Sequence, residues 1–320
     1  MIILITGATG LIGRQLALRL RRDGHQLFAW VRDEERARQQ LGAEVCLISD
    51  SGARAGRGSL EDAVQRADAV VNLAGEPIAA GRWSATRKAA IYDSRINLTR
   101  RLVRAIEGAE RRPEVLLSAS AVGFYGDRGG ETIDEASSAG EGFMAEVCRD
   151  WEHEARAAES LGVRVTIPRI GIVLARDGGA LTKMLPPFRA GFGGPLGDGR
   201  QFMAWIHLHD LVEVLVTALT DRRYSGPFNA TAPAPVTNRV FTKTLGRVLR
   251  RPTFFRVPGA MLSLALGKMA QVVLHGQRAE PERLVALGFS FRFGVVEEAL
   301  RDLLADDDSV GIERLGADSG

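Results

Sequence analysis

The N-terminal segment constrains the fold most, because it joins an apolar run directly to a glycine-rich loop. Residues 1–6 read MIILIT, a continuous apolar run typical of a strand buried on both faces of a parallel sheet. The loop TGATGLIG follows, with glycines at positions 7, 10 and 13, and an amphipathic pattern then runs to residue 22. A buried strand, a glycine turn and a helix in this order predict a phosphate-binding βαβ unit.

Strand-like and helix-like segments alternate through the first half of the chain. The predicted strands are residues 1–6, 26–31, 44–48, 69–73, 115–117 and 163–167. The predicted helices are residues 11–22, 33–41, 84–110 and 143–161, with a further helix start at Ser59. Because parallel neighbours need helical crossovers, this alternation predicts an α/β fold with a doubly wound parallel (Rossmann) sheet.

The pattern changes after about residue 169, where glycine and proline gather in two clusters and helical segments follow. We expect a smaller mixed C-terminal substrate domain that covers the carboxyl ends of the strands. The helical segments are predicted at residues 236–249, 258–274 and 295–304. The predicted domains are 1–175 for dinucleotide binding, with return segments near 203–230, then 176–202 and 231–305 for substrate, and 306–320 as a disordered tail.

The charge balance argues against a nucleic-acid partner. The chain has 42 Lys+Arg against 39 Asp+Glu, a formal net charge of only +3, which supplies little field for holding a polyanion. The basic residues are nearly all arginines. The four lysines are Lys88, Lys183, Lys243 and Lys268. Only these four residues could therefore serve a mechanism that requires a lysine.

Cysteine content and hydropathy indicate where in the cell the protein is expected. Cys46 and Cys148 are far apart and form no metal-like pattern, so we expect no metal site and a reduced, cytoplasmic protein. The N-terminus has neither a basic leader region nor a cleavage site. The apolar stretch 257–274 is short and interrupted by Lys268, so no membrane partner is expected.

The glycine loop predicts a bound dinucleotide. Its residues expected at the cofactor are Gly7, Thr9, Gly10, Leu11, Ile12 and Gly13. The first glycine permits a tight turn, the second lets the backbone approach a pyrophosphate, and the third lets the helix pack closely on the strand. A structural glycine turn without a ligand is the alternative, which the strand–turn–helix context disfavours.

The end of the second predicted strand decides between NAD and NADP. It reads Trp30-Val31-Arg32-Asp33, with Arg32 at the place, about 20 residues past the glycine loop, where an acid would select NAD. An arginine there accommodates a 2′-phosphate, so Val31 and Arg32 favour NADP(H), and Arg14 is either a second positive group or a solvated residue. Asp33 would be the NAD-type acid if the register shifted by one, but we expect it to cap a helix.

The next two strands also end in residues suited to a ligand. The segment VNLAG places Leu73, Ala74 and Gly75 after a central strand, where small residues let a cofactor lie against the backbone. A plain turn is the alternative. Ser118 ends the following strand and is assigned to the same cofactor site.

With these pieces the sequence resembles the extended short-chain dehydrogenase/reductases. The motifs that carry the resemblance are TGATGLIG, VNLAG, SASAVGFYG (118–126) and WIHLHDL (205–211). Stretches such as AEVCRDWE and GGALTKMLPPFRAGFGGPLGDG make it similar, more narrowly, to an atypical epimerase-family subgroup with a small C-terminal domain. The resemblance extends to about residue 304, and it implies the fold and a nicotinamide cofactor more strongly than any activity.

The resemblance also implies a catalytic Tyr-x-x-x-Lys pair, which this chain lacks. In the family the tyrosine is the general acid/base, and the lysine lowers its pKa and holds the nicotinamide ribose. No tyrosine here has a lysine four residues later, and no lysine lies between Lys88 and Lys183. With Glu152 as an anchor, Met144 falls at the tyrosine position and Cys148 at the lysine position.

Other residues are candidates for the missing chemistry. Tyr125, in the loop after the fifth strand, is predicted to donate a hydrogen bond to a substrate carbonyl, unless it is a packed loop aromatic. The resemblance implies, as a separate possibility, that Ser118 or Ser120 polarises a carbonyl as the family serine does, and a hydrogen bond within a turn is the alternative for both. Glu146 is a base only if it is buried, and a solvated helix glutamate is commoner. Cys148 is disfavoured as a nucleophile, because no lysine or nearby preceding histidine lowers its pKa. Arg95 is on the long helix that flanks the cofactor.

Two further features have alternative interpretations. Lys88 and Arg95 lie on the same predicted helix. Each of them either faces the cofactor or is exposed to solvent. His207, His209 and Asp210 suggest a metal site, but we expect Asp210 to cap or anchor a helix.

The sequence thus predicts an NADP(H)-binding epimerase-family protein, an oxidoreductase or epimerase acting on a carbonyl or sugar-like small molecule. A non-catalytic NADP(H)-binding sensor or scaffold is the alternative. The oligomeric state stays open.

Overall fold

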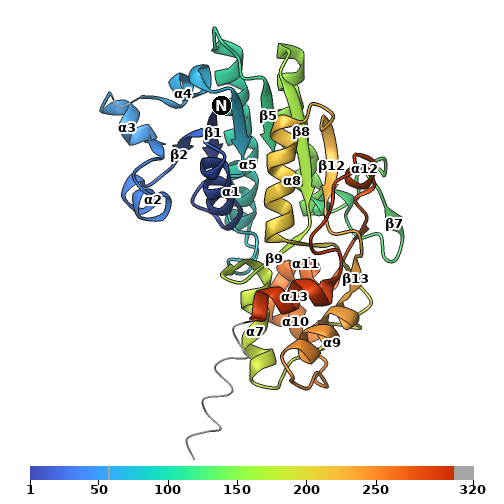
Figure 1. The fold of residues 1–320 in the computed structure, drawn as a ribbon. Helices are drawn as coiled ribbons and strands as arrows, with labels where there is room; N and C mark the ends of the chain where they lie inside the picture. The colour runs from blue at the N-terminus through green and yellow to red at the C-terminus, as the bar shows by residue number, and fades with distance from the viewer. Residues whose placement is uncertain (57, 306–320) are drawn as a thin grey trace, which may run out of the picture.

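An eight-stranded parallel sheet forms the centre of the computed structural model, which describes residues 1–56 and 58–305 (Figure 1). The strand order is β12-β8-β5-β4-β1-β2-β3, and each neighbouring pair is parallel. The strands are β1 (Ile2–Thr6), β2 (Gln26–Trp30), β3 (Cys46–Ile48), β4 (Ala69–Asn72), β5 (Val115–Ser118), β8 (Arg164–Ile170) and β12 (Gly226–Ala230), with β6 (Ser120–Ala121) also pairing with β8. The predicted doubly wound Rossmann sheet is confirmed.

Helices cover both faces of the sheet. On one face lie α1 (Leu11–Arg22), α2 (Glu34–Leu41) and α8 (Leu208–Thr220), and on the other α4 (Leu60–Arg66), α5 (Ala85–Gly108) and α6 (Phe143–Arg156). Short segments α3 (Asp50–Arg54), η1 (Val122–Tyr125) and η2 (Ala157–Leu161) join them. Alternate strand residues face opposite layers, so that Ile3 and Ile5 pack against one core and Leu4 against the other. Burial on both faces explains the continuous apolar run of β1.

A third apolar core lies beyond the carboxyl ends of the sheet strands, toward the bottom of Figure 1. Its elements are β9 (Ile172–Ala175), α7 (Gly179–Arg189), β10 (Phe202–Met203), β11 (Trp205–His207), β13 (Val236–Thr237), α9 (Asn238–Val248) and α13 (Val296–Leu304). Trp205, Phe241 and Phe293 are buried among them. The predicted domain boundaries stay a prediction, and the predicted tail at 306–320 lies outside the described residues.

The prediction of one helix over 258–274 is wrong. The segment divides into α10 (Gly259–Leu266), the 3-10 turn η3 (Gly267–Met269) and α11 (Ala270–Leu274). Gly267 adopts a φ of +60°, a left-handed conformation that ends α10. The remaining short elements are β7 (Thr132–Ile133), which pairs with β14 (Arg278–Ala279), and α12 (Glu282–Ala286).

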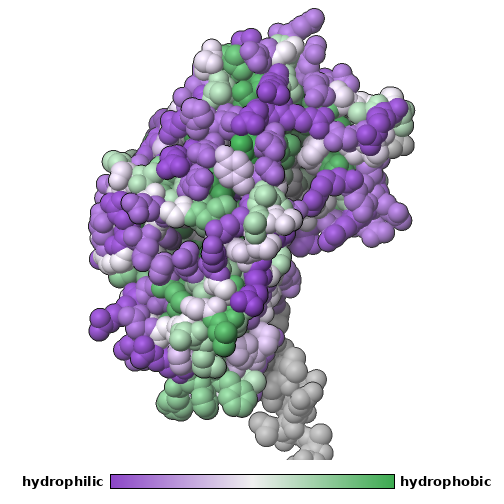
Figure 2. Space-filling view, turned by 180° about the vertical axis from the view of Figure 1, so that it is seen from behind, coloured by the Kyte–Doolittle hydropathy of each residue, from purple (hydrophilic) through white to green (hydrophobic). Residues whose placement is uncertain are grey.

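Apolar side chains gather at the lower end of the molecule, where α7, α9 and α10 lie (Figures 1 and 2). No side chain of α10 is buried, and Phe254, Met261 and Leu264 are exposed. In the part of the chain that the structure describes, no helix is both long enough and apolar enough to span a bilayer.

Candidate functional site

The glycine loop between β1 and α1 has no room for a side chain at its first and third glycines. Gly7 has a φ of +72°, and a Cβ there would lie 2.7 Å from the backbone nitrogen of Ala74. A Cβ on Gly13 would lie 2.2 Å from the carbonyl oxygen of Gly7. The loop therefore makes the tight turn and the close helix contact that the sequence predicts.

The N-terminus of α1 is open toward this loop. Gly10 is its N-cap residue and provides no side-chain cap, so the first N–H groups of the helix, at Leu11 and Ile12, have no intrahelical acceptor. The Nε atom of Arg14 is buried and has no hydrogen-bond partner among the described residues. Free N–H groups at a helix N-terminus fit a phosphate group, and the Arg14 guanidinium on the same turn adds a positive charge. Thr9 is half-buried in the same loop.

The end of β2 presents a guanidinium to solvent. Val31 is buried, while the Arg32 side chain is 83% exposed and lies 3.0 Å from Glu76. Glu76 also binds Arg87, at 3.2 Å, and these two arginines hold the pKa of its carboxyl below the usual value, with the Arg32 hydrogen bond as the largest cause. Asp33 accepts a hydrogen bond from the backbone N–H of Arg36 at 3.0 Å. The prediction that Asp33 caps a helix is confirmed.

The residues after β4 and at the end of β5 lie along the same edge of the sheet. The Leu73 N–H donates to the Thr6 carbonyl, and Ala74 touches the glycine loop. Gly75 packs against the guanidinium of Arg95. Ser118 is fully buried, and its hydroxyl accepts a hydrogen bond from the Asn72 amide at 3.2 Å.

A buried network joins the two predicted catalytic residues. The Ser120 hydroxyl donates to Glu152 at 2.7 Å, and Glu152 forms a two-bond ion pair with Arg169 at 2.8 and 2.9 Å. Arg169 also donates to the Tyr125 hydroxyl at 2.9 Å, and Tyr125 donates to the amide oxygen of Asn229 at 2.7 Å. Ser120 and Tyr125 therefore share one chain of hydrogen bonds, although they were predicted separately.

Burial disfavours ionisation of the Tyr125 hydroxyl and of the Cys148 thiol. It raises the pKa of Tyr125 to about 12, because desolvation outweighs the favourable charge of Arg169. It also raises the pKa of Cys148 to about 11, so this thiol is neutral at ordinary pH. A neutral, fully buried thiol is a poor nucleophile, in agreement with the expectation from the sequence.

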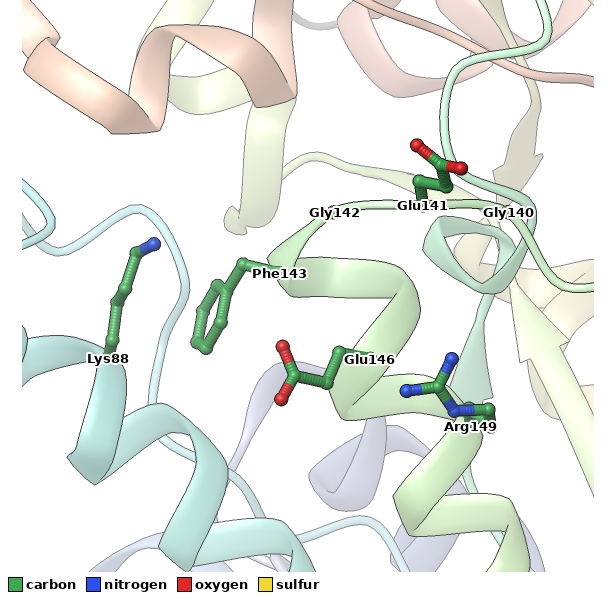
Figure 3. Close-up of a pocket in the computed structure, with 7 residues that line it drawn as sticks. All are labelled: Lys88, Gly140, Glu141, Gly142, Phe143, Glu146 and Arg149. Atoms are coloured by element: carbon green, nitrogen blue, oxygen red, sulfur yellow. The ribbon is translucent and has the colours of Figure 1, made fainter.

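A hollow of about 400 Å³ opens at the N-terminus of α6, outside the glycine loop (Figure 3). Lys88 on α5 and Glu146 on α6 both border it, and Phe143 lies between them. The Lys88 ammonium stands 4.7 Å from the centre of the Phe143 ring. Glu146 is exposed, so the condition for its use as a buried base is not met.

His207, His209 and Asp210 make contacts that cap a helix and anchor a neighbouring segment. The backbone N–H of His209 donates to the His207 ring at 3.0 Å, which caps α8. The Asp210 carboxylate accepts hydrogen bonds from the backbone N–H groups of Arg292 and Phe293 at 3.0 and 2.9 Å. Asp210 thus anchors the segment before α13, as expected. Within residues 1–56 and 58–305 no group of three or more potential ligands is placed to hold a metal ion.

Sequence reasoning missed three residues of the network. Glu152 served only as an anchor for alignment, and Arg169 and Asn229 were not considered. A charged residue inside the apolar run of β8 was the available signal for Arg169, because a buried strand tolerates an arginine only with a buried partner.

Comparison with known proteins identifies the family. The model of the NAD dependent epimerase/dehydratase family matches residues 3–230, and the chain belongs to this family. Residues 257–303 match a domain of unknown function. This pairing, together with the relatives described next, confirms the predicted resemblance to the atypical epimerase-family subgroup of the extended short-chain dehydrogenase/reductases.

Similar proteins from a plant, a bacterium and human are each named as epimerase family proteins. The chain is 44% identical over 310 residues to the chloroplastic epimerase family protein SDR39U1 homolog of Arabidopsis thaliana, covering 95% of this chain and 87% of that one. It is 37% identical to the epimerase family protein YfhF of Bacillus subtilis, covering 96% and 99%. The crystal structure of human epimerase family protein SDR39U1, solved with NADPH, is 33% identical, with a TM-score of 0.84 over 96% of this chain and all of that one.

Proposed function

We propose that this protein binds NADP(H) and is an oxidoreductase or epimerase acting on a carbonyl or sugar-like small molecule. The observation that carries the proposal is the cradle formed by the glycine loop and the open N-terminus of α1, and the first turn of this helix also carries Arg14, whose buried Nε atom has no partner among the described residues. The residues proposed to line the cofactor are Gly7, Thr9, Gly10, Leu11, Ile12, Gly13, Val31, Arg32, Leu73, Ala74, Gly75 and Ser118. The human relative solved with NADPH supports the choice of cofactor.

Arg32 is proposed to select NADP(H) over NAD(H). Its side chain is exposed after β2, where its contact is the Glu76 carboxylate, and an arginine there suits a 2′-phosphate. Asp33, the rival for NAD, has its carboxylate engaged as a helix cap. We also propose a cytoplasmic location, since both cysteines are free thiols.

Ser120 and Tyr125 are the proposed catalytic pair. When bound, the nicotinamide supplies hydride transfer, and the protein must supply orientation and a proton. Because the Ser120 proton points to Glu152, its hydroxyl oxygen is suited to accept a hydrogen bond from a substrate hydroxyl. Tyr125 donates to a substrate carbonyl only by exchanging its bond to Asn229, which replaces one neutral oxygen acceptor with another.

A second candidate is an NADP(H)-binding sensor or scaffold without turnover. It is favoured by Met144 and Cys148 at the positions of the family's tyrosine and lysine. The neutral Cys148 thiol supplies no charge there, and Tyr125, with a pKa of about 12, is a weak acid.

One experiment separates the candidates. The purified protein is titrated with NADPH and NADH, followed by fluorescence, and then incubated with a panel of carbonyl compounds and nucleotide sugars. Turnover that falls in Tyr125→Phe supports the catalytic proposal, while turnover that survives this change removes Tyr125 as the proton donor. Binding of NADPH with no turnover favours the sensor.

A further inference from the structure

Arg95 is a buried charge that the proposed chemistry leaves unexplained. It lies on α5, is 9% exposed, and donates hydrogen bonds only to backbone carbonyls among the contacts of the described residues. These bonds reach Ile91 at 3.0 Å and Glu76 at 3.2 Å from each of two nitrogens. A guanidinium has five N–H groups, so these three bonds leave donors for another acceptor.

No carboxylate neutralises this guanidinium within the described residues. The Glu76 carboxylate acts on it electrostatically, but Arg32 and Arg87 hold both of its oxygens. The other neighbour is the ring of Trp151, whose centre lies 5.3 Å from the guanidinium carbon. A buried cation that donates hydrogen bonds to backbone carbonyls and to no carboxylate is costly to keep, and a ligand that accepts its remaining N–H groups would lower this cost.

The position of Arg95 indicates which ligand. A Cβ on Gly75 would lie 2.8 Å from the guanidinium carbon, so Arg95 lies directly against the loop after β4 that lines the cradle. Cys148 and Trp151 place it beside α6 on the other side. α6 itself contains no lysine.

The strand order then assigns a half of the cofactor. β1, whose loop holds the phosphates, lies between β2 and β4. A dinucleotide centred on that loop extends one half toward β2, where Arg32 is, and the other toward β4 and β5, where Arg95 is.

We propose that Arg95 binds oxygen atoms of the nicotinamide mononucleotide half of NADP(H), and that it supplies from α5 the fixed positive charge that no lysine on α6 supplies. This inference rests on the proposed binding of NADP(H). Arg95 stays protonated, so it binds and orients the cofactor and transfers no proton.

The test compares the whole cofactor with its adenosine half. Dissociation constants for NADPH and for 2′,5′-ADP are measured by calorimetry on the wild type, Arg95→Met, Arg95→Lys and, as a matched control, Arg32→Met. We expect Arg95→Met to weaken NADPH on the order of tenfold or more and to leave 2′,5′-ADP within about twofold. Arg95→Lys, which keeps the charge but not the fork, should weaken NADPH less, and Arg32→Met should weaken both ligands.

Three results would overturn the inference. Unchanged NADPH affinity in Arg95→Met would show that Arg95 does not touch the cofactor. Equal weakening of both ligands would make its role structural, and if Arg95→Met does not fold, the same comparison in Arg95→Lys decides. A wild type that binds neither ligand would refute the proposed cofactor and Arg95's role together, which distinguishes that failure from a failure of Arg95 alone.

Discussion

Arg169 on β8 and Glu152 on α6 form a two-bond ion pair in the interior of the protein, with both side chains only 4% exposed. The pair joins the central sheet to α6. It also connects Ser120 to Tyr125, so it sets the geometry of both proposed catalytic groups.

Removing one partner of this pair should destabilise the fold. We expect Glu152→Gln to lower the free energy of unfolding by about 3–5 kcal/mol, because it leaves the Arg169 charge buried and unpaired. Urea unfolding followed by circular dichroism measures this. Glu154→Gln on the same helix is the control, since the Arg100–Glu154 pair is exposed and should matter little. Similar losses in the two variants would contradict the assigned role of the buried pair.

The glycine cradle should tolerate no side chain at Gly13. Because a Cβ there would meet the Gly7 carbonyl at 2.2 Å, Gly13→Ala must shift α1 away from the loop. We expect a loss of about 1–3 kcal/mol in stability and loss of NADPH binding by titration. Gly108→Ala at the end of α5 is the matched control, because nothing lies within 4 Å of the added atom. NADPH binding that persists in Gly13→Ala would place the cofactor elsewhere.

Local patterns predicted most of the parallel sheet but not its last strand. The apolar runs of β1, β4 and β5 are buried on both faces, which is why periodicity identified them. β12 was missed because Gly226 and Pro227 are typical of a turn. The structure accommodates the proline because β12 is an edge strand, where a missing N–H costs no ladder bond on the open side.

The sequence predicted the parts of the candidate site whose residues are contiguous in the chain. The glycine loop and the Asp33 cap are contiguous motifs whose geometry follows from a few neighbouring residues. The network of Ser120, Glu152, Arg169 and Asn229 brings together four separate elements. These side chains meet only in the folded protein, so no spacing between them in the sequence predicts the network.

Alkaline pH should destabilise the protein through Tyr125. Its pKa of about 12 lies above the unfolded value of 10, so the folded state retains the proton longer than the unfolded state does. This contribution is complete below about pH 10 and is lost as the pH rises to about 12, by roughly 2–3 kcal/mol. Unfolding measured from pH 9 to 12 should show a steeper decline in the wild type than in Tyr125→Phe. Parallel declines would show that Tyr125 ionises as freely in the folded state as in the unfolded chain.

The Arg32–Glu76 ion pair should oppose cofactor binding. The Glu76 carboxylate occupies the guanidinium that is proposed to hold the 2′-phosphate. We expect Glu76→Gln to tighten NADPH binding by about two- to fivefold and to change NADH binding less, since the exposed pair is weak. Calorimetric titration with both nucleotides measures this. Weaker NADPH binding in the variant would mean that Glu76 supports the site and does not compete for Arg32.

The most direct test of the account is the ratio of the dissociation constants for NADH and NADPH, measured by fluorescence titration of the wild type and of Arg32→Gln. The account predicts that the wild type binds NADPH at least about tenfold more tightly than NADH, and that Arg32→Gln removes most of this preference. Equal affinity of the wild type for the two nucleotides, or a preference for NADPH that survives in Arg32→Gln, would contradict it.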